Sequence, residues 1–115
     1  MDLEELLRRL ALNDEHVVRS AVGAGPTTPG DALLDARTSA LARLASLLTV
    51  GATTESCRVT VELARSAGCS DEEIVGVLMA IAPAVGGARL VTAAPLLALA
   101  IDRDVEEADR AWEPG

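Results

Sequence analysis

The chain has no phenylalanine, tyrosine or lysine, and only one tryptophan, one histidine and two cysteines. The lack of aromatic side chains excludes a platform on which the bases of single-stranded nucleic acid could stack. Two cysteines are too few for a disulfide-rich scaffold. His16, Cys57 and Cys69 do not have the spacing of a structural zinc site, so His16 is read as a helix surface residue. We expect no metal and no cofactor.

Positive charge is also scarce. Ten arginines stand against eighteen aspartates and glutamates, which gives a formal net charge of −8 at pH 7. Such a chain repels the phosphate backbone of nucleic acids and the anionic surface of membranes. Residues 1–5 are acidic where a secretory signal is basic, and no long apolar segment follows them. We therefore expect a cytoplasmic protein that binds neither nucleic acid nor membranes.

Small apolar residues are abundant, and they predict a close-packed core of alanine, valine, leucine and isoleucine. Between Ile74 and Ile101 the one charged residue is Arg89, which divides the stretch into halves too short for the roughly 20 residues of a membrane span. The stretch is typical of two helices buried nearly all round. A single domain of 115 residues buries too little surface to cover both helices. The pattern predicts a subunit interface.

Apolar residues recur at spacings of three and four, and no segment alternates with a period of two, so the sequence predicts an all-α protein of about six to seven helices. The expected organisation is an N-terminal helical hairpin at 1–23, a Gly/Pro-rich linker at 24–33, a helical body at 34–103, and a short C-terminal helix and tail at 104–115.

Helix boundaries follow from capping residues. Asn13 is expected to cap the second helix and Asp35 the third, and Ser70 with Glu73 forms a capping box for a helix over 71–85. Two prolines interrupt the apolar helices. Pro83 predicts a kink or an early end, and Pro95 predicts a bend or a break.

Cys57 is the one candidate nucleophile. It is expected in the first turn of its helix, where the helix dipole favours a thiolate, and Arg58 beside it is a candidate for ligand binding. The alternative is that Cys57 is a small core residue. Cys69, which follows the helix stop at Gly68, is expected to make a hydrophobic contact.

Arg89 needs a carboxylate, carbonyl groups or water around its guanidinium. In a structural role it forms an ion pair or binds the carbonyl groups of the Gly86-Gly87 turn. In a functional role it binds the carboxylate of a small ligand between helices. A charged stripe of Glu55, Arg58, Glu62 and Arg65 is typical of a solvated or interface face with i, i+3 and i, i+4 pairs. Within it Glu62, like Glu55, is a candidate acid or base if burial raises its pKa.

Residues 61–78, VELARSAGCSDEEIVGVL, are followed by APAVGGAR at 82–89 and by Ala-Ala-Pro at 93–95. Over Leu33 to Asp102 the sequence resembles the carboxymuconolactone decarboxylase-like family. The resemblance implies an all-helical subunit whose central antiparallel hairpin packs against its neighbours in trimers or hexamers. It also implies lactone decarboxylase chemistry with a histidine before the glycine, or alkylhydroperoxidase D chemistry with Cys-x-x-Cys and a histidine.

The residues depart from both patterns, because the histidine position falls on Thr60 and the second cysteine position on Ser56. We therefore predict a divergent member that binds a small acidic or hydrophobic ligand or only assembles. One alternative is a peroxidase that uses Cys57 alone with an external thiol. Another is an acid/base enzyme on a carboxylated or lactone substrate, with Arg89 as anchor and a glutamate as base.

Overall fold

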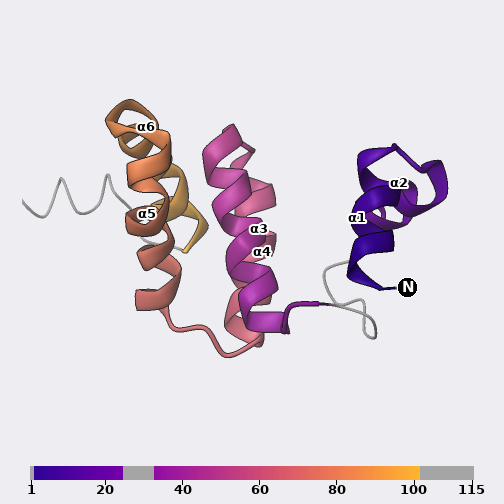
Figure 1. The fold of residues 1–115 in the computed structure, drawn as a ribbon. Coiled ribbons are helices and arrows are strands. Elements are labelled where there is room, and N and C mark those ends of the chain that lie inside the picture. The colour runs from indigo at the N-terminus through magenta and orange to yellow at the C-terminus, as the bar shows by residue number, and fades with distance from the viewer. Residues whose placement is uncertain (1, 25–32, 102–115) are drawn as a thin grey trace, which may run out of the picture. The chain divides into compact units, whose positions relative to one another are not determined.

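The computed structural model describes residues 2–24 and 33–101, which form six α-helices and no strand (Figure 1). The helices are α1 (Leu3–Ala11), α2 (Glu15–Val22), α3 (Ala36–Val50), α4 (Thr54–Ser66), α5 (Asp71–Val85) and α6 (Gly87–Ala100). The prediction of an all-α fold is confirmed. The expected C-terminal helix and most of the linker lie outside the described residues. The chain divides into two compact units, residues 1–31 and 32–115.

The N-terminal unit is a pair of short helices in contact, α1 and α2. Asp2 caps α1 by accepting a hydrogen bond from the amide of Glu5, and Asp14 caps α2 by accepting one from Val17. The expectation that Asn13 is this cap is wrong. Asn13 has a φ of 58° and makes the left-handed turn between the helices, a conformation that asparagine tolerates, so the next residue takes the cap.

The body consists of α3 to α6. The helix α3 packs on α4 and α5, and α6 packs on the same two helices. Its core is made of aliphatic side chains and the two cysteines, with Leu44, Leu48, Val61, Ile74 and Leu97 as the largest members at 0–1% exposure. Among the described residues of the body there is no aromatic side chain, so in the core the helices meet through side chains no larger than leucine or isoleucine.

Two of the predicted body caps hold as expected. The Asp35 carboxylate accepts a 2.7 Å hydrogen bond from the Thr38 amide, and this bond lowers the pKa of Asp35. Ser70 and Glu73 form the capping box of α5, and Arg37 at the start of α3 pairs with Glu73. The bond from the Ser70 amide and the Arg37 guanidinium lower the pKa of Glu73.

Both prolines lie inside helices. The helix α5 continues past Pro83 to Val85, and α6 continues through Pro95 to Ala100, so there is no early end and no break. A proline removes one backbone hydrogen bond, and the neighbours Ala93 and Leu97 hold the helix by packing into the core at 1% exposure.

Candidate functional site

The helix α4 carries three of the four candidate residues, on two different faces. Its inner face is buried and consists of Cys57, Thr60, Val61 and Ala64. Arg58 and Glu62 lie outside this buried face.

Cys57 lies in the hydrophobic core at 0% exposure. Its own amide donates a 3.1 Å hydrogen bond to the Thr53 carbonyl, so it is the first amide of the regular helical ladder. Burial raises the pKa of the Cys57 thiol, because a thiolate loses its hydration there. The thiol is therefore held neutral and covered.

Thr60 is the residue on which spacing from Gly68 places the histidine expected from the family resemblance. It is buried at 7% exposure, and its hydroxyl donates a 3.1 Å hydrogen bond to the carbonyl of Ser56 one turn earlier. This hydroxyl is satisfied within the helix, and an aliphatic hydroxyl cannot replace imidazole as a base at neutral pH. Cys57 and Thr60 thus both face the core of the body, the first with a neutral thiol and the second with a satisfied hydroxyl.

The two arginines of the charged stripe on α4 donate hydrogen bonds to backbone carbonyl groups at the end of α6. Arg58 pairs with Glu55 at 3.6 Å and donates a 3.2 Å hydrogen bond to the Leu99 carbonyl, while its Nε is buried with no partner among the described residues. Arg65 pairs with Glu62 and donates a 3.2 Å hydrogen bond to the Ile101 carbonyl.

Carbonyl groups at a helix C-terminus lack intrahelical partners and carry partial negative charge. The two arginines therefore neutralise and cap the end of α6. The predicted i, i+3 pairs are confirmed, whereas the i, i+4 pair expected between Arg58 and Glu62 is not formed. The contact with α6 could not be predicted, because periodicity describes one helix at a time.

Glu62 is largely exposed, with 60% of its side-chain surface open to solvent, and its carboxylate pairs with Arg65 at 3.0 Å. The structure therefore provides no buried environment of the kind that an acid/base role for Glu62 requires.

Arg89 lies in the first turn of α6 and is half-buried. It makes no hydrogen bond or ion pair with any described residue. Its guanidinium lies against Gly51, the left-handed residue that ends α3, and a Cβ at Gly51 would be 3.0 Å from Nη1 of Arg89. A cation beside the C-terminal end of a helix interacts favourably with the helix dipole.

The structure does not bring the four candidates together. Arg58 contacts α6 at Leu99, ten residues from Arg89, which corresponds to about 15 Å along the helix axis. Arg58 and Glu62 belong to the junction between α4 and α6, Cys57 belongs to the core, and Arg89 stands at the end of α3.

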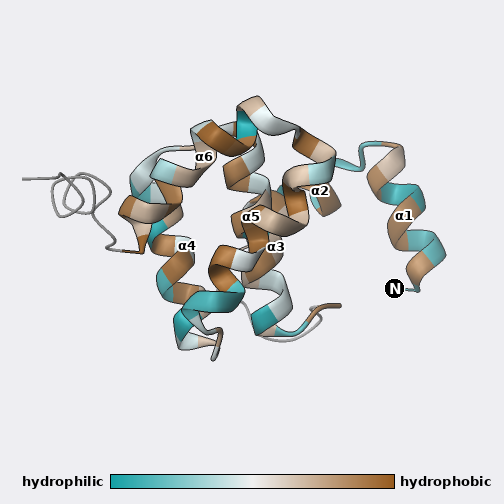
Figure 2. Cartoon of the chain, turned by 90° about the vertical axis from the view of Figure 1, so that its left-hand side faces the viewer, coloured by the Kyte–Doolittle hydropathy of each residue, from teal (hydrophilic) through white to brown (hydrophobic). Residues whose placement is uncertain are grey.

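An uncovered apolar face runs along α5 and α6. Figure 2 shows hydrophobic residues recurring along both helices. The largest exposed apolar side chains of these two helices are Val75 (42%), Met79 (71%), Val91 (73%) and Leu99 (46%). The other exposed residues of these two helices after Glu73 are small or weakly polar, namely Gly76, Ala80, Pro83, Ala84, Gly87, Ala88, Thr92, Ala94 and Pro95. No charged residue interrupts α5 after Glu73, so this face differs from the salt-bridged surface of α4.

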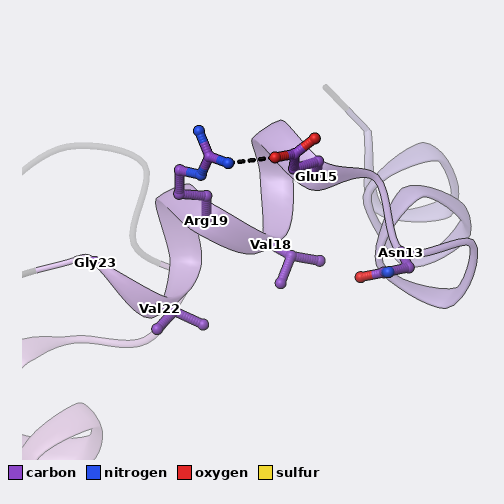
Figure 3. A pocket seen from close by; sticks show the side chains of 6 residues that line it. All are labelled: Asn13, Glu15, Val18, Arg19, Val22 and Gly23. Carbon is purple, nitrogen blue, oxygen red and sulfur yellow. Dashed lines mark hydrogen bonds and ion pairs between the residues drawn. The ribbon is translucent and has the colours of Figure 1, made fainter.

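The N-terminal unit has a shallow hollow of its own along α2 (Figure 3). Val18 and Val22 line it, and the ion pair of Glu15 with Arg19 stands beside them. Asn13 and Gly23 complete the lining. It contains none of the candidate residues.

Within residues 2–24 and 33–101, no group of three or more histidine, cysteine, aspartate or glutamate residues is arranged to hold a metal ion. In the same part of the chain, no helix combines the length and the apolar character that crossing a bilayer requires.

The family model of the carboxymuconolactone decarboxylase family matches residues 19–99, well over half of the chain. The chain belongs to this family. The match begins in α2, earlier than the resemblance seen in the motifs, and covers α3 to α5 and nearly all of α6. No curated protein sequence and no solved structure matches the chain.

Proposed function

We propose that this carboxymuconolactone decarboxylase family member is a self-assembling protein that works without the family's histidine and cysteine-pair chemistry. The observation that supports it is the uncharged apolar face of α5 and α6. Full burial of a valine or methionine side chain contributes about 1.5–3 kcal/mol, so covering Val75, Met79 and Val91 on each subunit is a substantial driving force. The expected partner is a second copy, and the family resemblance suggests trimers or hexamers.

The assembly is tested by the same substitution at two exposed alanines. Ala80→Glu places a charge on the apolar face of α5, whereas Ala42→Glu places it on the exposed surface of α3. By sedimentation velocity we expect the wild type and Ala42→Glu to be oligomers of equal size and Ala80→Glu to sediment as a smaller species. A wild-type monomer at micromolar concentration, or an Ala80→Glu oligomer of unchanged size, would overturn the proposal.

A second candidate function is the binding of a small carboxylated ligand, with Arg89 as its anchor. The supporting observation is that this half-buried guanidinium has no acceptor among the described residues. Arg58 is the weaker candidate for the same role, because Glu55 and the Leu99 carbonyl already engage it. A guanidinium pairs with a carboxylate through two parallel hydrogen bonds, which makes a small dicarboxylate the natural probe.

Ligand binding is tested by calorimetric titration with succinate. We expect Arg89→Gln to lose the binding and Arg43→Gln, at an exposed arginine of α3, to keep it. Unchanged succinate binding in Arg89→Gln, or none in the wild type, counts against this role. Circular dichroism of both variants separates a lost ligand contact from a lost fold.

The geometry favours assembly and binding over the two enzymatic alternatives. A single-cysteine peroxidase needs an accessible thiolate, but Cys57 is covered and its pKa is raised. An acid/base enzyme needs a buried carboxylate, but Glu62 is largely exposed and paired. A cytoplasmic location is part of the proposal.

A further inference from the structure

The helix α1 has an uncovered leucine stripe. Leu3, Leu7 and Leu10 are 63%, 66% and 40% exposed, and no residue of α1 is buried. The two helices of the N-terminal unit have nine and eight residues, fewer than the roughly 12–15 that an isolated helix needs in water. Val17 is the one buried hydrophobic residue described in this unit. Burial of the leucine stripe against a partner would therefore stabilise this unit.

The charges of α1 indicate what that partner is. Residues 3–10 read LEELLRRL, and this segment read backwards exchanges every glutamate for an arginine while every leucine stays in place. When two copies of α1 run antiparallel about a two-fold axis between Leu6 and Leu7, leucines come level with leucines and glutamates with arginines.

The charged residues on either side of the leucine stripe determine whether two copies of α1 pair parallel or antiparallel. Residues four apart are neighbours on a helix, so Glu4 and Arg8 share one flank and Glu5 and Arg9 share the other. In an antiparallel pair each flank meets the same flank of the partner, reversed, so Glu4 lies beside Arg8 of the partner subunit. In a parallel pair each flank meets the opposite one, which brings Glu4 towards Glu5 of the partner subunit.

The ion pairs of α1 leave one flank open. Arg9 and Glu5 bind each other at 2.6 Å within the helix. Glu4 and Arg8 are exposed, and neither forms an ion pair with a described residue. The flank of Glu4 and Arg8 is thus available to a second chain.

We infer that α1 is a self-complementary docking surface through which two copies of this chain pair antiparallel, leucine stripe against leucine stripe. Each copy contributes one acid and one base, so the symmetric pair contains two ion pairs between Glu4 and Arg8. This surface is separate from the α5 and α6 face, and it links copies whether or not that face assembles.

Charge reversal tests the pairing in the full-length chain. Glu4→Arg or Arg8→Glu alone replaces both ion pairs with repulsive contacts, and we expect each to weaken pairing about tenfold in Kd. A one-to-one mixture of the two variant proteins restores attraction at both contacts. Native mass spectrometry of isotopically distinguished chains is expected to show mixed pairs well above the statistical fraction. The double variant Glu4→Arg/Arg8→Glu is expected to pair as tightly as the wild type.

Controls with the same charge changes lie on α2. Glu15→Arg and Arg19→Glu alter an exposed ion pair away from the leucine stripe, and they are expected to leave pairing unchanged. Repeating the measurement in the Ala80→Glu background separates this surface from the proposed body assembly. Statistical mixing of Glu4→Arg and Arg8→Glu chains would overturn the inference, and tighter pairing by Glu4→Arg alone would also overturn it, because that result is expected of a parallel pair.

Discussion

Both the backbone conformation at Gly51 and a side chain from another helix require glycine at this position. The residue ends α3 with a φ of 81°, and the guanidinium of Arg89 occupies the space where a Cβ would stand. A left-handed conformation costs a residue with a side chain about 1–2 kcal/mol. Glycine is therefore required here for two independent reasons.

We predict that Gly51→Ala lowers the free energy of unfolding by about 1–2 kcal/mol, measured by urea denaturation. Gly76→Ala, measured in the Ala80→Glu background in which the proposed assembly face is open, is the matched control, because Gly76 lies inside α5 with no atom close to an added Cβ and is expected to gain about 0.5–1 kcal/mol. In the Arg89→Ala background the Gly51→Ala penalty shrinks but persists, since the backbone strain remains. Equal effects at both glycines would contradict this account.

The reactivity of Cys57 provides a second prediction at this scale. Because the thiol is fully buried and its pKa is raised, we expect N-ethylmaleimide to label Cys57 at least about a hundredfold more slowly in the folded than in the urea-unfolded protein. Peptide mass spectrometry after timed quenching measures the rate. A rapid adduct at Cys57 in the folded protein only would instead favour the peroxidase alternative.

Between elements, charged side chains at helix ends hold the body together. Arg37 joins the start of α3 to the capping box of α5, and Arg65 joins α4 to Asp71 in α5 at 3.0 Å. The hydrogen bond to Asp71 raises the pKa of Arg65. Both contacts link helix termini, where backbone groups lack intrahelical partners.

The capping box predicts a response to acid. The folded-state pKa of Glu73 is lowered, so its stabilising contribution is complete above the ordinary glutamate pKa of about 4.3 and is lost as pH falls through the lower folded value. Glu73→Gln is expected to be less stable than the wild type at pH 7 and to lose less stability between pH 7 and pH 3.

Thermal denaturation at several pH values measures this difference. Glu72→Gln is the control, because Glu72 lies in the same turn but outside the hydrogen bonds of the box. A Glu73→Gln profile parallel to that of the wild type would show that the pairing with Ser70 and Arg37 contributes nothing.

For the molecule as a whole, the proposed assembly links stability to concentration. Burial of the α5 and α6 face stabilises only the folded state, so the Tm is expected to rise with protein concentration, and Ala80→Glu is expected to reduce this dependence to what pairing through α1 contributes. Differential scanning calorimetry over a hundredfold range of concentration checks this. A Tm independent of concentration in the wild type would contradict an assembly coupled to folding.

The sequence alone determined the elements. Apolar spacing, the Asp35 cap and the Ser70–Glu73 box are local features, and each predicted a helix close to its observed bounds because capping acts within one turn. The expectations for Asn13 and Pro95 were wrong because local sequence does not determine those two positions. Asn13 makes a left-handed turn between two helices, and the packing of α6 on the core keeps the helix intact at Pro95. The family, too, could be read from the motifs.

Only the tertiary structure decided where the candidate residues lie and what they contact. Whether Cys57 lies in the core or opens to solvent, whether Arg58 and Arg65 stay on α4 or reach α6, and whether Arg89 lies beside the Gly86-Gly87 turn or Gly51 depend on contacts between residues distant in the chain. Burial and partners set the pKa and reactivity of a side chain, and both are properties of packing. Local sequence specifies helices, whereas the environment of each functional group arises when the helices meet.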